Sequence, residues 1–291
     1  MDGYVRSGAF ADELPLAFPA RSGSCFAGIV RSRGHGVEMS VGTEVLGHDP
    51  QHGAQANWVV VPVGAVVRKP AVLSWEVAGG LYLAGVTAFT VVTDLHLTDQ
   101  DVLVVSAAAG GVGHLECQLA RIAGATVLGI AGTENHDYLR SIGVVPVASG
   151  DGLEARLRTA GKDRTITAFI DNHGSYEALV ASLGVPRHRF GSSADRGRIE
   201  MRFYQAPGDD PEPATVLQDL VELVSTWGLR PLISGFYAFE HVQEALADLD
   251  SRHSRGKVVI GMHTVAPAPT YLGTKLRALH EQRLANAAEQ A

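Results

Sequence analysis

Two patterns of hydrophobic positions divide the chain near residue 86. Before that point, short apolar runs at 28–30, 42–45, 58–62 and 65–67 are separated by glycine, proline or polar residues every few positions. Such runs, bounded by turn-forming residues, are typical of short antiparallel strands. We therefore expect a small β domain in the first part of the chain.

After residue 86, short buried strands alternate with longer amphipathic segments. The strands are predicted at 102–105, 126–130, 166–170 and 257–260, and the helices at 112–123, 137–141, 176–183, 213–227 and 239–249. Strands that alternate with helices imply a parallel sheet with helices on both faces. The predicted fold class is therefore α/β, a doubly wound parallel sheet.

Composition narrows the classes of protein that fit. Of 291 residues, 46% are hydrophobic and 19% are charged, which excludes a disordered or disulfide-stapled chain. A net charge of −7 favours neither a nucleic acid nor an anionic membrane as partner. No apolar run is judged long enough to span a bilayer and no signal peptide is recognised, so with only two cysteines we expect a cytoplasmic protein.

A glycine-rich loop carries the clearest chemical signal. Ala108-x-Gly110-x-x-Gly113 follows the strand at 102–105 and opens the next helix, which is the context of a dinucleotide-binding fingerprint. Gly110 and Gly111 would let the backbone approach a pyrophosphate, and Gly113 would let the helix pack closely on the strand. The alternative is a glycine-rich turn without a ligand.

The turn after the next strand bears on the choice between NADP and NAD. An NAD site usually has an acid at the end of this strand, whereas positions 131 and 132 are Ala and Gly. Thr133, Asn135 and His136 could donate hydrogen bonds to a 2′-phosphate, and Glu134 is the one acid in the turn. The pattern favours NADPH, with NADH as the alternative.

A set of motifs in fixed order resembles one family. The motifs are the segments 2–8, 27–30, 73–76, 83–88, 107–113, 171–174 and 255–259. In this order they resemble the zinc-free medium-chain dehydrogenase/reductases, in the NADPH:quinone oxidoreductase branch. The resemblance implies a GroES-like substrate domain at 1–90 and 229–262 with a Rossmann NADP-binding domain at 91–228 inserted into it. A C-terminal linker and helix would occupy 263–291.

The resemblance also implies residue roles. Tyr4 matches the tyrosine that faces the nicotinamide and the substrate, and its expected role is catalytic; the alternative is packing at the domain edge. The implied cofactor contacts are Thr87, Thr90, Gly110, Gly111, Val112, Gly132, Thr133, Asn135, His136, Asn172, Gly191, Ser192, Arg252 and Lys257. For Arg252 and Lys257 the alternative is an ordinary surface charge.

The chain departs from the family pattern at its first residues. It begins inside the first motif, without that motif's asparagine and the strands that open the β domain in relatives. A late start of the gene model and a real shortening both remain open. Further on, Cys25, Thr43 and Trp58 stand within segments where the family has other residues.

Metal and nucleophile chemistry are not favoured. The cysteine and histidine sets of the zinc-dependent relatives cannot be assembled from this sequence, and His48 and His52 flank a Pro- and Gly-containing loop rather than one helix face. Cys117 is expected in the core. Cys25 is expected as a small buried side chain, with a reactive thiol as the alternative.

The predicted function is an NADPH-dependent reductase that transfers a hydride, without metal, to a quinone or an α,β-unsaturated carbonyl. The expected substrate-pocket residues are Cys25, Phe26, His48, Trp58 and Tyr82. The alternatives are an enoyl or tailoring reductase of a secondary-metabolite pathway and an inactive NADPH-binding sensor or scaffold. A helix over 271–290, with Leu272, Leu276 and Leu279 along one side, suggests a homodimer; the alternative is a solvated tail.

Overall fold

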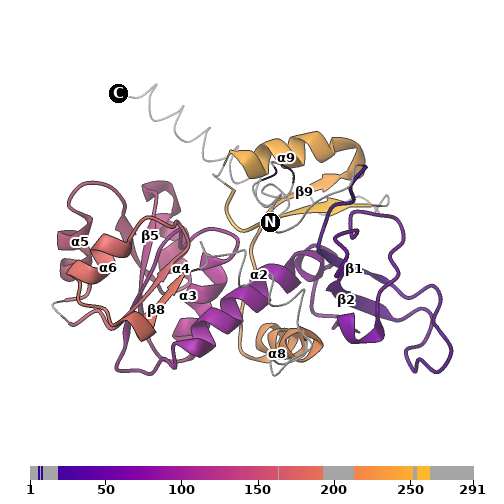
Figure 1. Ribbon diagram of the computed structural model, residues 1–291, viewed down its shortest axis with the longest axis horizontal. Coiled ribbons are helices and arrows are strands. Elements are labelled where there is room, and N and C mark those ends of the chain that lie inside the picture. Colours follow the sequence, from indigo (N-terminus) through magenta and orange to yellow (C-terminus); the bar gives the residue numbers. More distant parts are fainter. Residues whose placement is uncertain are drawn as a thin grey trace.

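Three β-sheets and the helices packed on them make up the computed structural model (Figure 1), which describes residues 6, 8, 19–162, 164–192, 213–251 and 254–262. One sheet has five parallel strands in the order β6-β5-β4-β7-β8. A second has three antiparallel strands, β1-β2-β3, and a third has two parallel strands, β10-β9. The predicted parallel α/β fold is thereby confirmed.

The five-stranded sheet contains the predicted strands at 102–105, 126–130 and 166–170, whereas the predicted strand at 257–260 belongs to the two-stranded sheet. Its strands are β4 (Val102–Val105), β5 (Thr126–Ala131), β6 (Val145–Ala148), β7 (Ala168–Asp171) and β8 (Phe190–Ser192). The helices between them are α3 (Gly113–Ile122), α4 (His136–Ser141), α5 (Leu153–Ala160) and α6 (Glu177–Ser182). The sequence did not predict β6, α5 or β8, because a four-residue run such as Val145–Ala148 includes a proline and only one buried side chain.

Both faces of this sheet are buried. Side chains alternate across a strand, so Leu103 and Val105 of β4 belong to one hydrophobic cluster and Val102 and Val104 to another. The first cluster includes α3 and α4 residues, and the second includes α5 and α6 residues. This double coverage explains why the strands are apolar at every position.

The antiparallel sheet is smaller than predicted. Its strands are β1 (Cys25–Ile29), β2 (Glu44–His48) and β3 (Val66–Arg68). The predicted strand at 58–62 is wrong, since these residues are irregular and Val60 is 98% exposed. A run of valines forms a strand only where a neighbouring strand supplies hydrogen bonds and packing, and within the described residues none pairs with this segment.

A long helix, α2 (Trp75–Asp94), was not predicted; the sequence pattern indicated short strands up to residue 85. The helix begins at Ser74, whose hydroxyl accepts a hydrogen bond from the Val77 N–H. It is apolar on nearly all sides, and an 18-residue window within it has a mean hydropathy of 1.4, which would suit a membrane span by length and composition. The expectation that no apolar run reaches that length is therefore wrong, but 67% of this window is buried inside the protein, as in a core helix.

Helix α2 lies centrally, between the five-stranded sheet and the antiparallel sheet (Figure 1). It contacts β1, α3 and α8 (Pro213–Thr226), and also the third sheet, which is formed by β9 (Ile233–Ala238) and β10 (Lys257–Gly261). Helix α9 (Val242–Asp250) covers β9 and β10. The predicted domain boundary between residues 90 and 91 falls inside α2, and the domain limits stay a prediction.

Candidate functional site

The loops that carry most of the predicted cofactor residues share one edge of the five-stranded sheet. They follow β4, β5 and β7, and the carboxyl ends of parallel strands meet at the same edge. From β4 the chain order runs to β5 and β6 on one side and to β7 and β8 on the other. In open α/β sheets, ligands bind outside the carboxyl ends at such a switch point.

The glycine loop at this edge has no room for side chains. A Cβ atom at Gly113 would collide with the Ala107 carbonyl oxygen, and one at Gly111 would lie 3.1 Å from the Gly256 carbonyl oxygen and from Lys257 Cδ. The Gly256 N–H donates a hydrogen bond to the Ala109 carbonyl oxygen at 3.2 Å. The start of β10 therefore packs against the loop. Bare backbone before a helix N-terminus fits a dinucleotide pyrophosphate.

A buried histidine connects this loop to the segment before β9. His114 Nδ1 donates to the Gly110 carbonyl oxygen at 2.8 Å, and His114 Nε2 accepts from the Leu232 N–H at 3.0 Å. Burial lowers the pKa of His114 to about 4, against the opposing effect of the bond to Gly110. The neutral ring with its proton on Nδ1 therefore holds the loop in place.

A network of buried polar groups fixes the ends of β4 and β7. The Asp171 carboxylate accepts hydrogen bonds from Ser106 Oγ and from four successive backbone N–H groups, those of residues 173–176. Burial alone would raise the pKa of Asp171, but these donors keep it below its ordinary value. The Asn172 side-chain amide donates to the Ser106 carbonyl oxygen and to the buried carboxylate of Glu116 in α3.

The turn after β5 brings together the residues predicted for the 2′-phosphate. Gly132 precedes a short 3₁₀ turn over Thr133–Asn135, and His136 begins α4 with Nε2 3.4 Å from the Ala131 carbonyl oxygen. The Glu134 side chain folds back over the Cα of Gly132, and its Oε1 accepts a hydrogen bond from Asn135 Nδ2. A carboxylate therefore lies at the end of β5, although no acid stands at position 131 or 132.

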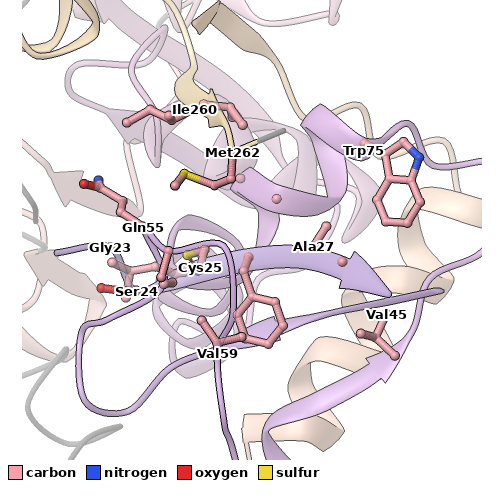
Figure 2. A pocket seen from close by; sticks show the side chains of 18 of the residues that line it. Gly23, Ser24, Cys25, Ala27, Val45, Gln55, Val59, Trp75, Ile260 and Met262 are labelled. Atoms are coloured by element: carbon pink, nitrogen blue, oxygen red, sulfur yellow. Dashed lines mark hydrogen bonds between the residues drawn. The ribbon is translucent and has the colours of Figure 1, made fainter. Parts of the chain in front are cut away.

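A cavity of about 1270 Å³ lies between the antiparallel sheet, α2 and the third sheet. Figure 2 shows Cys25 and Ala27 on β1, with Ile260 and Met262 on the other side of the cavity. Of the predicted pocket residues, Cys25, Phe26 and Trp58 line it. The predicted cofactor residues Thr87, Gly111, Val112 and Lys257 also line it, so the cavity reaches the glycine loop.

Two predicted pocket residues do not line the cavity. The His48 and Tyr82 rings stack on each other, 4.2 Å apart and 5° from parallel, and they are 5% and 1% exposed. Burial lowers the pKa of His48 to about 4, although a hydrogen bond with the Ala65 backbone acts in the other direction. Both side chains are therefore buried in the interior and do not face the cavity. Thr90 is half-buried on α2 and also lies outside the lining.

The remaining predicted residues divide into two groups. Gly191 packs against α2, where an added Cβ would lie 2.8 Å from Val91 Cγ1, and Ser192 Oγ donates to the Asp171 carbonyl oxygen at 3.3 Å. Both are the last residues of β8, at the carboxyl edge of the sheet, and their contact with a cofactor stays a prediction. Tyr4, Arg252 and the helix at 271–290 lie outside the described residues.

Within the described part of the chain, the two cysteines differ in burial and no group of metal-binding side chains forms. Cys117 is fully buried, and burial raises the pKa of its thiol well above the ordinary value, as expected for a core residue. Cys25, which was expected to be buried, is only half-buried, and its sulfur accepts a hydrogen bond from the Leu83 N–H. Within the described ranges, no three His, Cys, Asp or Glu side chains form a group that could hold a metal ion, so these residues do not fit a zinc centre.

Three charged or polar residues of this edge were not predicted. His114 and Glu116 lie in a helix whose first turn reads as polar, and nothing in the sequence places them at 0% exposure. Arg255 was noted only within a motif, yet its side chain reaches the turn after β5. These contacts join residues far apart in the sequence: Glu116 and Asn172 are 56 positions apart, His114 and Leu232 are 118 apart, and Arg255 and Asn135 are 120 apart.

Comparison with known proteins gives consistent matches. A family model described as zinc-binding dehydrogenase matches residues 137–260. A quinone oxidoreductase of Salmonella typhimurium is 33% identical over 287 residues, which cover 97% of this chain and 83% of that protein. The fold is similar to that of the Escherichia coli quinone oxidoreductase complexed with NADPH, with a TM-score of 0.73, 22% identity, and 89% and 87% of the two chains covered. It is also similar to that of the CurK enoyl reductase, with a TM-score of 0.78, 20% identity, and 90% and 87% covered.

Proposed function

Because the chain belongs to the quinone oxidoreductase branch of the medium-chain dehydrogenase/reductases, a family of oxidoreductases, we propose that it is an NADPH-dependent reductase. Its substrate would be a quinone or an α,β-unsaturated carbonyl compound. Such acceptors are already electron-poor, so the reaction needs no Lewis acid. The quinone oxidoreductase relatives and the neighbour complexed with NADPH support this substrate and cofactor.

One observation carries the proposal: the apolar cavity is continuous with the glycine loop. Gly111 and Val112 belong both to the loop and to the lining of the cavity, beside Thr87 of α2 and Lys257 of β10. A dinucleotide with its pyrophosphate on the loop would therefore extend its other end into an apolar space. That space is where the substrate would meet it.

The chain's own residues would contribute binding, position and exclusion of water. The backbone N–H groups at the start of α3 would bind the pyrophosphate, assisted by the Lys257 ammonium group. Reduced nicotinamide, when bound, supplies the hydride. The apolar walls, which include Phe26 and Trp58, would hold a flat substrate in a region of low water content. Thr87 also lines the cavity, and its Oγ1 donates to the Leu83 carbonyl oxygen at 2.7 Å, within its own helix.

The experiment is a turnover assay on the full chain. The protein is mixed with NADPH and either a benzoquinone or an enone, and the absorbance band of the reduced cofactor is followed. We expect cofactor oxidation that depends on the acceptor and is faster with NADPH than with NADH. Absence of oxidation above background with every quinone and enone tested would contradict the proposal.

The cavity size favours a second candidate, an enoyl or tailoring reductase with a larger substrate. Ligand pockets commonly enclose about 300–1,000 Å³, and this cavity of about 1270 Å³ exceeds what a benzoquinone and a nicotinamide ring require. The CurK enoyl reductase shares the fold. A panel of enones of increasing chain length separates the two, because a dedicated enoyl reductase would show kcat/KM rising with chain length.

Tight NADPH binding without turnover of any acceptor would favour a third reading, a sensor or scaffold without catalysis. The homodimer suggested by the C-terminal segment is also a proposal and needs an experiment of its own. Deleting residues 263–291 and measuring the mass in solution would show whether that segment is needed for association.

A further inference from the structure

Arg255 lies at the point where the chain returns from α9 to the glycine loop. Its backbone N–H donates to Ser234 Oγ at 3.1 Å, and the next residue, Gly256, is bonded to the Ala109 carbonyl oxygen. The backbone of Arg255 is therefore fixed between β9 and the loop. From this position, its side chain can extend only a limited distance along the carboxyl edge of the sheet.

The guanidinium group reaches the turn after β5. Arg255 Nε donates to Asn135 Oδ1 at 2.7 Å, and Nη2 donates to the Glu134 carbonyl oxygen at 3.0 Å. Both acceptors are uncharged. The side chain is half-buried, and within the described residues Nη1 has no hydrogen-bond acceptor. The Arg255 guanidinium group is thus held against the 3₁₀ turn at Thr133–Asn135, with N–H groups available to bind a ligand.

The turn also carries an opposing charge. The Glu134 carboxylate folds back over Gly132 and accepts a hydrogen bond from Asn135 Nδ2, the same side-chain amide whose Oδ1 accepts from Arg255. In doubly wound folds, the end of this strand is where the adenosine ribose of a dinucleotide is bound. A carboxylate there favours a free 2′-hydroxyl, whereas an arginine favours a 2′-phosphate.

On the basis of the proposed function, we propose that Arg255 selects NADPH by binding its 2′-phosphate, and that Glu134 opposes this preference. The planar guanidinium can make two parallel hydrogen bonds to phosphate oxygens. A doubly charged phosphate would replace the neutral Asn135 and Glu134 oxygens as acceptor. The Glu134 carboxylate, which repels the phosphate, would then limit the preference of this chain for NADPH over NADH.

The test is a titration of the full chain and its variants with NADPH and with NADH. In Arg255→Gln, we expect affinity for NADPH to fall about 10- to 100-fold, the loss of one or two charge-assisted hydrogen bonds, while affinity for NADH stays within about twofold. Arg255→Lys keeps the charge but lacks the planar guanidinium group, so its affinity for NADPH should lie between those of the unmodified protein and Arg255→Gln. Glu134→Gln should strengthen NADPH binding and weaken NADH binding.

Arg164→Gln is the matched control. Arg164 also joins two segments, since it donates to Thr126 Oγ1 at 2.9 Å and to the Gln100 carbonyl oxygen at 3.0 Å, but at the opposite, amino-terminal edge of the sheet. This variant should leave both affinities unchanged. Its thermal stability gives the cost of removing a bridging arginine without a role at the site.

Two results would overturn the inference. An equal loss of affinity for NADPH and NADH in Arg255→Gln would mean that Arg255 only holds the turn, and no loss would mean that the phosphate binds elsewhere. If the unmodified protein binds neither coenzyme, the proposed function fails by itself. Adenosine 2′,5′-bisphosphate then tests the Arg255 site separately, since the inference requires it to bind the unmodified protein and to bind Arg255→Gln about tenfold more weakly or worse.

Discussion

The two sides of the candidate site are built by different means. At the carboxyl edge of the five-stranded sheet, buried polar groups such as Asp171, Asn172 and His114 hold the backbone through hydrogen bonds. On the far side of the cavity, apolar side chains supply the walls, and Trp58 and Val60 are 64% and 98% exposed. The edge therefore has one defined geometry for one ligand, whereas the cavity wall defines only a shape and an apolar character.

The largest expected effect is the loss of the Asp171 carboxylate. Asp171→Ala would leave four backbone N–H groups and Ser106 Oγ without their acceptor, and we expect the free energy of unfolding to fall by about 3 kcal/mol or more. Urea denaturation of the variant and the unmodified protein measures this difference in the free energy of unfolding. Asp137→Ala, which removes an exposed carboxylate paired with Arg140, should stay within about 0.5 kcal/mol. If both variants cost the same, the polar network does not hold this edge.

The second prediction concerns acid sensitivity on both sides of the site. His48 and His114 each have a pKa lowered from 6.5 to about 4 in the folded state, so the unfolded chain binds about two more protons between these values. Their contribution to stability is complete above pH 6.5 and is lost as the pH falls toward 4.

Unfolding free energies measured across this range should show that loss. His114→Gln, which keeps hydrogen-bonding groups but cannot titrate, should have a slope shallower by about one proton. His48→Gln should do the same on the other side of the site. An unchanged slope in both variants would show that the two rings titrate normally in the folded protein.

The third prediction is that the same change, glycine to alanine, lowers the free energy of unfolding in one region and raises it in the other. A Cβ at Gly113 would collide with the Ala107 carbonyl, so Gly113→Ala should destabilise the fold by about 1–3 kcal/mol and weaken cofactor binding. At Gly79 of α2, the nearest atoms to an added Cβ are 3.7 and 3.8 Å away, so Gly79→Ala should stabilise by about 0.5–1 kcal/mol. Thermal or urea unfolding of both variants tests this. The same sign in both would remove the contrast.

The smallest effect is a difference in thiol reactivity. Cys25 lines the cavity and is half-exposed, whereas Cys117 is fully buried with a raised pKa. We expect N-ethylmaleimide to label Cys25 at least about tenfold faster than Cys117 in the native protein, since the thiolate is the reacting form. Mass spectrometry of Cys25→Ala and Cys117→Ala identifies the labelled position. Preferential labelling of Cys117 would mean that the core opens more readily than the cavity wall admits reagent.

The sequence allowed prediction of the parts whose signal is local. The strand at 102–105, the glycine loop and the helix that follows all lie within residues 102–122, and each has a pattern tied to its geometry. The parallel sheet follows from strands alternating with helices. The family resemblance supplied the order of the remaining segments, and the matches with known relatives confirm the family.

The rest depends on contacts that no local pattern records. Helix α2 was missed because a helix buried on nearly all sides has no polar face, and so its apolar run resembles adjoining strands. His48 and Tyr82 were predicted to line the pocket, but their rings stack on each other and are buried. The contact of Arg255 with Asn135 joins residues 120 positions apart.

The position of α2 has a consequence for how this protein can be divided. One hydrophobic cluster contains Leu46 and Val67 of the antiparallel sheet, Leu81 of α2, and Leu103 of the parallel sheet. The cluster is therefore shared between the part of the protein with the antiparallel sheet and the part with the parallel sheet. A fragment cut near residue 90 would expose part of it to water, and we expect the two halves to unfold together in one cooperative transition rather than as separable modules.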